Sequence, residues 1–199
     1  MISVGLTGNV ASGKSEVART WEKAGVPVVS ADDLAREAVA PGSPGLADVV
    51  AAFGEGILAS DGSLDRARLR EIVFRDPAAR ERLEEILHPR IAERREAWIQ
   101  ERAREGAELV VSEIPLLFEA GLEEAFDVVV VVHASEDARR RRLTRKRGLI
   151  PETAERIMAA QGDPEGKLER ADHVVRNDST LEELRARALE LLERLRSEA

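Results

Sequence analysis

A short apolar strand followed at once by a glycine-rich loop opens this 199-residue chain and limits the folds that it can adopt. Residues 2–7 are typical of a buried strand, and residues 8–15 read Gly-Asn-Val-Ala-Ser-Gly-Lys-Ser, which fits G-x-x-x-x-G-K-[ST] at every fixed position. The glycines let successive backbone N–H groups turn towards phosphate oxygens, and the helix that follows directs its positive end to the same anion. The pattern therefore predicts a phosphate-binding loop in an α/β fold.

The chemistry of a nucleoside triphosphate gives individual residues of this loop a role. Lys14 is expected to reach the β- and γ-phosphates of ATP, and the Ser15 hydroxyl is placed to ligate Mg²⁺. The turn lacks the G-x-G-x-x-G pattern of dinucleotide-binding folds, which disfavours a Rossmann oxidoreductase. We expect ATP to contact Gly8, Asn9, Val10, Ala11, Ser12, Gly13, Lys14, Ser15 and Glu16.

The remaining pattern predicts a parallel sheet flanked by helices, with a helical insertion between two of its strands. The five consecutive valines at 128–132 are typical of a central parallel strand covered on both faces. Inside the insertion, His88-Pro89 is expected to interrupt the helical stretch. The expected elements are a helix at 14–24, strands at 26–30, 108–112, 126–132 and 173–176, a helical block from 32 to about 106, helices at 139–147 and up to about 161, and a final amphipathic helix at 181–195.

An acidic pair, Asp32 and Asp33, follows the second expected strand. In a parallel sheet this is the carboxyl edge, where ligands bind and where the phosphate loop also lies. A carboxylate there can accept the proton of an acceptor hydroxyl and orient it for attack on the γ-phosphate. The competing interpretation is that Asp32 only caps the next helix; we favour Asp32 as the base and Asp33 as the cap.

Composition excludes several other classes of protein. The chain has no cysteine, and its three histidines are too scattered to suggest a metal site. Its net charge of −8 argues against bulk binding of nucleic acid or of anionic membranes. No apolar run approaches the roughly 18 residues of a membrane helix, and the N-terminus does not resemble a signal peptide. We therefore expect a cytoplasmic protein.

Beyond the phosphate loop, an ordered series of motifs resembles the dephospho-CoA kinase family over nearly the whole chain. A phosphate loop alone is generic, whereas such a series is specific. The motifs are GNVASGKSEVA (8–18), VSADDLAREAV (29–39) with Pro41-Gly42, DGSLD (61–65), LREIVF (69–74), LHP (87–89), PLLFE (115–119), AAQ (159–161), Lys167, Ala171-Asp172 and Asn177.

The resemblance implies that ATP phosphorylates the 3′-hydroxyl of the ribose of dephospho-CoA, giving CoA and ADP, in a P-loop NTPase fold. It implies a core at 1–33, 107–133 and 166–199, a helical substrate-binding (CoA) subdomain at about 34–106, and a lid at about 134–165. Asp32 matches the catalytic base. Arg142, in the basic run 139–147, matches a lid arginine that binds ATP and acts in catalysis, and Asn177 is placed near adenine. The implied substrate contacts are Asp32, His88, Pro115, Leu116 and Leu117.

Some positions depart from the family pattern. Ser30 replaces the first acid of a D-x-D pattern, Ala11 a usual glycine and Glu16 a usual threonine. No plain aspartate closes the strand at 108–112, so either Glu113 holds Mg²⁺ through water or it is an ordinary surface acid; the second interpretation is favoured. The oligomeric state, monomer or small homo-oligomer, stays open.

Other activities are compatible with a phosphate loop. An adenylate, shikimate or gluconate kinase would share it, and the insertion after Asp32 is the feature that separates these enzymes. A GTPase-like switch needs an N-K-x-D motif, which the four lysines of the chain do not provide. A nucleotide-binding module without activity is disfavoured because Lys14, Ser15 and Asp32 are all present.

Overall fold

This computed structural model describes residues 1–161 and 164–198, without the side chains of Lys146 and Arg147. The chain divides into two compact units, which we call the sheet unit (Met1–Val29 with Glu101–Ala199) and the helical unit (Ser30–Gln100). A five-stranded sheet has the order β2-β3-β1-β4-β5, and β1 pairs in parallel with both β3 and β4, as β4 does with β5. This confirms the predicted parallel sheet. The strands are β1 (Ile2–Thr7), β2 (Val28–Ser30), β3 (Leu109–Glu113), β4 (Val128–His133) and β5 (His173–Arg176).

The strands form where apolar β-branched residues follow one another, because both faces of the sheet are covered. Val4, Leu6, Val130 and Val132 have no exposed surface, although they alternate with other buried residues along the same strands. The second strand is shorter than the predicted 26–30. Val26 and Pro27, the first two residues of the predicted strand, belong to the turn after the first helix. The Val26 N–H bonds to the Trp21 carbonyl, and Pro27 has no N–H to donate.

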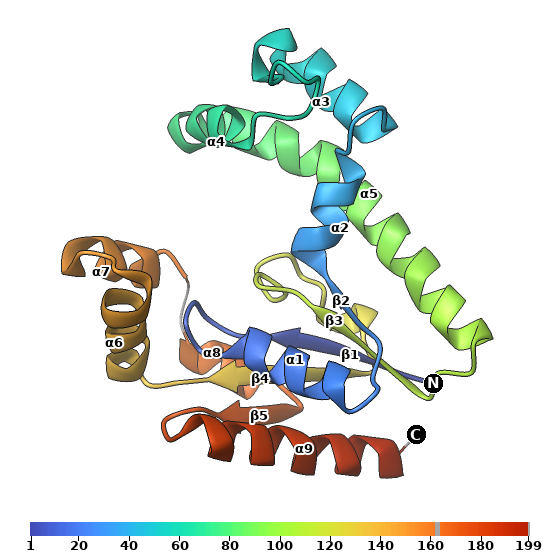
Figure 1. The fold of residues 1–199 in the computed structure, drawn as a ribbon, viewed down its shortest axis with the longest axis vertical. Helices are drawn as coiled ribbons and strands as arrows, with labels where there is room; N and C mark the ends of the chain where they lie inside the picture. The colour runs from blue at the N-terminus through green and yellow to red at the C-terminus, as the bar shows by residue number, and fades with distance from the viewer. Residues whose placement is uncertain (162–163, 199) are drawn as a thin grey trace. The chain divides into compact units, whose positions relative to one another are not determined.

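Helices α1 (Lys14–Lys23) and α9 (Leu181–Ser197) of the sheet unit pack side by side along the sheet (Figure 1). Their contact includes a buried hydrogen bond, in which the Trp21 indole Nε1 donates to the Ala188 carbonyl at 2.7 Å. The six-residue helix α8 was not predicted, because so short a segment carries no clear periodicity. The helices of this unit are α1 (Lys14–Lys23), α6 (Glu136–Arg147), α7 (Pro151–Ala159), α8 (Pro164–Glu169) and α9 (Leu181–Ser197), with a 3₁₀ turn η2 (Glu123–Ala125).

The helical unit contains the predicted helical block. Its elements are α2 (Ala31–Ala38), α3 (Pro44–Phe53), a 3₁₀ turn η1 (Glu55–Ile57), α4 (Arg66–Arg75) and α5 (Pro77–Arg104), whose last four residues belong to the sheet unit. These helices enclose a small core of their own, made of Val39, Leu46, Val49, Ile57 and Leu69. Partly buried residues of α4 and α5 surround this core. The unit therefore has its own apolar centre.

The structure corrects two local predictions in this unit. His88-Pro89 does not interrupt the helix, because α5 runs through Pro89 without a break. Pro89 cannot donate to the carbonyl four residues earlier, but the apolar side chains just before it, Leu83, Ile86 and Leu87, pack against the core and hold the helix in place.

The second correction concerns the start of α2. Ser30 occupies the N-cap position, and neither Asp32 nor Asp33 caps the helix. Both acids lie in the first turn, where the positive end of the helix favours a carboxylate, and Asp33 pairs with Arg36. The helix begins at Ala31, earlier than predicted, because it follows directly on the end of β2.

No helix among the described residues is both long enough and apolar enough to cross a membrane.

Candidate active site

The phosphate loop joins β1 to α1 and requires glycine at two points. At Gly8 φ is 152°, and a Cβ there would lie 2.4 Å from the Val132 carbonyl oxygen. At Gly13 φ is 104°, and a Cβ would lie 2.2 Å from Nδ2 of Asn177. Ala11 also adopts a positive φ, 58°, which a residue with a side chain seldom does. The backbone thus has the curvature that the motif predicts, in a space too tight for a side chain at either glycine.

Lys14 and Ser15 share one acidic partner at the end of β3. Oε1 of Glu113 accepts a hydrogen bond from the Lys14 ammonium at 2.8 Å and another from the Ser15 hydroxyl at 2.8 Å. The side chains of Lys14 and Glu113 are 12% and 14% exposed, so this ion pair is largely shielded from water. The register of β1 and β3, which sets Leu6 opposite Glu113, brings the acid to the loop.

This arrangement suits a magnesium ion. Mg²⁺ prefers oxygen ligands and usually takes one or two from the protein, the rest coming from phosphates and water. The hydroxyl of Ser15 and the carboxylate of Glu113 are two such oxygens, already in contact with each other. The described residues contain no cluster of three or more metal-binding side chains, as a dedicated protein cage would require. A surface acid is therefore a poor description of Glu113.

Arg142 and Asn177 hold the loop from the C-terminal half of the chain. The Arg142 guanidinium donates to the carbonyls of Ala11 at 3.0 Å, Ser12 at 3.3 Å and Asn177 at 2.7 Å. The Asn177 side chain is buried and donates through Nδ2 to the Ser12 carbonyl at 2.6 Å. Burial lowers the pKa of Arg142, but a guanidinium remains protonated at neutral pH. Both side chains were predicted to contact ATP, and in the structure both bind backbone carbonyls of the phosphate loop.

The other arginines of the basic helix α6 differ widely in their surroundings. Arg140 is paired with Glu136, Asp137 and Glu155. Arg139 is buried, its Nη1 has no hydrogen-bond partner among the described residues, and burial lowers its pKa. The helix is therefore only partly a solvated charged face. Of the predicted basic run, Lys146 and Arg147 lie outside the described side chains.

The segment after β3 carries three of the predicted substrate contacts. Leu116 is 44% exposed, whereas Leu117 is fully buried and lies under Gly5 of β1. The Pro115 carbonyl accepts a hydrogen bond from the Thr7 hydroxyl at 3.4 Å, which ties this segment to the end of β1. Exposure thus favours Leu116 as the residue that a substrate can touch, and the role of all three stays a prediction.

Two further predicted residues belong to the helical unit. Asp32 is exposed in the first turn of α2, which directly follows the end of β2. His88 is exposed on α5, next to Pro89. The sheet unit holds the remaining predicted residues, from Gly8 to Glu16 on the loop, with Glu16 accepting hydrogen bonds from Arg19 and Arg185 at 2.7 Å each. The roles of Asp32 and His88 stay predictions.

Three residues next to the loop received no role from the sequence. Lys167, on α8, donates to Oδ1 of Asn9 at 2.9 Å and to Oε1 of Glu119 at 2.6 Å. Gln161 accepts a hydrogen bond from the Val10 N–H through Oε1 at 2.5 Å. All three of Lys167, Glu119 and Gln161 stand in motifs of the family resemblance, and that was the only signal for them. Because these residues lie far from the loop along the chain, no local sequence pattern predicts the contacts.

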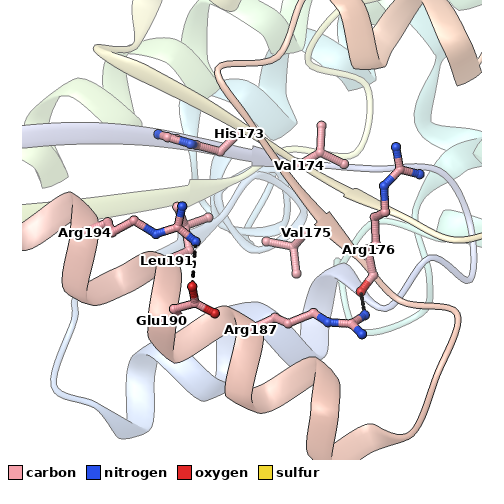
Figure 2. Close-up of a pocket in the computed structure, with 8 residues that line it drawn as sticks. All are labelled: His173, Val174, Val175, Arg176, Arg187, Glu190, Leu191 and Arg194. Atoms are coloured by element: carbon pink, nitrogen blue, oxygen red, sulfur yellow. Dashed lines mark hydrogen bonds and ion pairs between the residues drawn. The ribbon is translucent and has the colours of Figure 1, made fainter.

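A hollow of about 330 Å³ lies between β5 and α9 (Figure 2). Two of its three arginines already have protein partners: Arg187 donates to the Arg176 carbonyl at 2.8 Å, and Arg194 pairs with Glu190 at 3.1 Å. None of the residues that line it belongs to the phosphate loop. The candidate active site is therefore the loop with Glu113, and not this hollow.

Comparison with known proteins bears on the whole chain. A family model described as dephospho-CoA kinase matches residues 2–183. The dephospho-CoA kinase of Streptomyces avermitilis is 47% identical over 187 residues, which cover 94% of this chain and 90% of that protein. The solved structure of the dephospho-CoA kinase from Campylobacter jejuni has a TM-score of 0.76 at 26% identity, covering 98% of this chain and 97% of that one.

A shikimate kinase from Bacteroides thetaiotaomicron has a TM-score of 0.53 at 18% identity, with 96% of this chain and 98% of that one covered, and shares the fold alone. The predicted P-loop kinase fold and the resemblance drawn from the motifs are thus confirmed. With the family model spanning most of its length, the chain belongs to the dephospho-CoA kinase family.

Proposed function

We propose that this chain transfers the γ-phosphoryl group of ATP to the 3′-hydroxyl of the ribose of dephospho-CoA, giving CoA and ADP in the final step of coenzyme A synthesis. The observation that carries the proposal is the joint contact of Lys14 and Ser15 with Glu113, in a strand–loop–helix of a chain that belongs to the dephospho-CoA kinase family. Dephospho-CoA kinase is a phosphotransferase with an alcohol as acceptor.

On the donor side, the loop binds the phosphates of ATP through its backbone N–H groups and through Lys14. When ATP binds, the Lys14 ammonium leaves the Glu113 carboxylate for the β- and γ-phosphates, where it neutralises the charge that develops during transfer. Ser15 and Glu113 would then hold Mg²⁺, which supplies further positive charge to the phosphate oxygens. Arg142 and Asn177 support this step by fixing the carbonyls of the loop.

On the acceptor side, Asp32 acts as the base. Its carboxylate takes the proton of the ribose 3′-hydroxyl while that oxygen forms a bond to the γ-phosphorus. The bond between the γ-phosphorus and the bridging oxygen breaks, and its electron pair leaves with ADP. Two features support this role: Asp32 is exposed, and it lies in the first turn of α2, directly after the end of β2.

Substrate recognition is divided between segments of the chain. We place dephospho-CoA against the helical subdomain at about 34–106, with His88 at its border, and against Pro115, Leu116 and Leu117 in the sheet unit. The region at about 134–165, with Arg142, serves as the lid over ATP, and Asn177 approaches the adenine. We further propose that the enzyme is cytoplasmic and is a monomer or a small homo-oligomer. The net charge of −8 supports the proposal that it has no nucleic-acid partner.

A coupled assay of ADP formation tests the proposal. The full chain is supplied with ATP and Mg²⁺ and, in separate reactions, with dephospho-CoA, adenosine monophosphate, shikimate or gluconate, and the product is identified by mass spectrometry. We expect turnover with dephospho-CoA alone and a product that carries one added phosphoryl group. Lys14→Met is the matched control that should abolish ADP formation without unfolding the chain. Turnover of another acceptor in place of dephospho-CoA would overturn the assignment.

A further inference from the structure

Lys167 is a buried charged residue to which the proposed mechanism gives no task. It is 8% exposed, and lysine is almost never so buried without a partner. Its ammonium has two: Oδ1 of Asn9 at 2.9 Å and Oε1 of Glu119 at 2.6 Å. One of these partners is the second residue of the phosphate loop, and the other lies on the segment that follows β3. A single side chain therefore joins two parts of the candidate site.

The phosphate loop receives a second contact from the same stretch of chain. Oε1 of Gln161, just after α7, accepts a hydrogen bond from the Val10 N–H at 2.5 Å. Asn9 and Val10 lie in the first half of the loop, ahead of Gly13 and Lys14. The first half of the loop is thus held at the Asn9 side chain and at the Val10 backbone N–H. These two contacts limit the conformations that the second half of the loop can adopt.

The segment after β3 is also tied to Arg170, the residue that directly follows α8. The Arg170 guanidinium lies over the Phe118 ring, 4.8 Å from its centre, and pairs with Glu123. Within the described part of the chain, Arg170 makes no hydrogen bond or ion pair with the phosphate loop, whereas Lys167 reaches both the loop and the segment. This difference separates the two basic residues: Arg170 fastens α8 to the segment, and Lys167 connects the segment to the loop.

We propose that Lys167 is a positioning residue for phosphoryl transfer, which keeps the segment after β3 in register with the phosphate loop. The inference rests on the proposed function, in which the loop holds ATP and Pro115–Leu117 contact dephospho-CoA. A displacement of about 1 Å between donor and acceptor can slow an in-line reaction by about 100-fold. A charge-assisted bridge in a site with little water resists such a displacement better than a neutral hydrogen bond does.

Lys167→Met tests this role, because methionine keeps most of the buried side chain and removes the bridge. Glu119 is 34% exposed at its side chain, so water can solvate it once its partner is gone. We expect kcat to fall about 10- to 100-fold while KM for ATP and KM for dephospho-CoA change by less than about threefold. Thermal denaturation should show a melting temperature within a few degrees of the parent chain.

Arg170→Met is the matched control, since it removes an arginine that holds α8 to the same segment without touching the loop. Its kcat should stay within about threefold of the parent. Two results would overturn the proposal: a Lys167→Met chain with kcat within about twofold of the parent, or an Arg170→Met chain that loses as much kcat as Lys167→Met. The second result would mean that both residues only stabilise α8.

Glu119→Gln keeps the test decisive if Lys167→Met does not fold at the assay temperature. This change preserves the volume and the acceptor oxygen of the side chain but removes its charge. The proposal then requires kcat to fall at least about fivefold with the melting temperature unchanged, and a kcat within about twofold of the parent contradicts it. A parent chain that does not turn over dephospho-CoA contradicts the proposed function instead, so the two failures are distinguishable.

Discussion

The two units of this chain bury their apolar residues in different ways. In the sheet unit, strands β1, β3 and β4 supply fully buried valines and leucines, and α1 and α9 add Trp21 and a stripe of leucines to the same core. The helical unit has a smaller fully buried centre around Val49 and Ile57, and most of the apolar residues around it are only partly buried. Fewer buried contacts lower the free energy of local opening. The nucleotide loop is thus mounted on the better packed of the two units.

The largest effects are expected where each unit contributes to the reaction. Asp32→Asn, in the helical unit, should lower kcat by about 100- to 10,000-fold and leave the affinity for ATP nearly unchanged, because the amide cannot take the proton. Lys14→Met, in the sheet unit, should lower both kcat and the affinity for ATP, because the proposed contact of Lys14 with the phosphates exists in the ground state as well. Steady-state kinetics and calorimetric ATP titration measure the two quantities separately.

Full activity of the Asp32→Asn chain would remove Asp32 from the mechanism. Asp33→Asn, which changes the exposed neighbour paired with Arg36, is the control and should keep kcat within about threefold of the parent.

Core truncations test the difference in packing. Leu192→Ala and Ile57→Ala remove similar volumes from sites that are each 1% exposed, and each should cost about 2–5 kcal/mol of stability in its own unit. In amide hydrogen exchange, Ile57→Ala should raise exchange in residues 30–100 and leave the amides of β1 and β4 protected. Leu192→Ala should instead weaken protection in α1 and α9. Identical exchange patterns for the two variants would show that the units open together.

A smaller effect concerns the end of β4. Burial, and then the charge of Arg176 and that of Arg139, lower the pKa of His133, while Asp178 opposes the shift. A histidine with a lowered folded-state pKa takes up a proton more readily when unfolded, so stability falls as pH drops through the unfolded pKa of about 6.5. His133→Gln should therefore flatten the fall in urea-unfolding free energy between pH 7 and pH 5. Since His133 is partly solvated, the difference should stay below about 1 kcal/mol. An unchanged pH slope in the variant contradicts this cause.

The smallest expected effect lies in the phosphate loop itself. Ala11 has a φ of 58°, which costs a non-glycine residue about 1 kcal/mol, so Ala11→Gly relieves strain in the folded chain. Glycine also gains freedom in the unfolded chain, which offsets about 0.4–1 kcal/mol. The net change in the free energy of unfolding should be within about 0.5 kcal/mol of zero, with kcat unchanged. A clear loss of stability would show that the Ala11 methyl group packs favourably.

Local patterns predicted most of the elements, and the misses have identifiable causes. The strands β1 and β4 and the helix α1 were predicted because each has a local signal, an apolar run or the loop motif, within a few consecutive residues. The break expected at Pro89 was wrong because the packing of Leu83, Ile86 and Leu87 outweighs one missing hydrogen bond. The cap expected at Asp33 was wrong because α2 begins directly at the end of β2.

The candidate site divides in the same way. The phosphate loop could be predicted without a structure, since the spacing from Gly8 to Ser15 specifies the backbone and the two side chains that phosphate requires. The partners of the two lysines come from the folded chain: Glu113 lies 99 residues from Lys14, and Asn9 lies 158 residues from Lys167. Such contacts depend on strand order and register, which bring distant segments to one edge of the sheet, and no local pattern encodes that meeting.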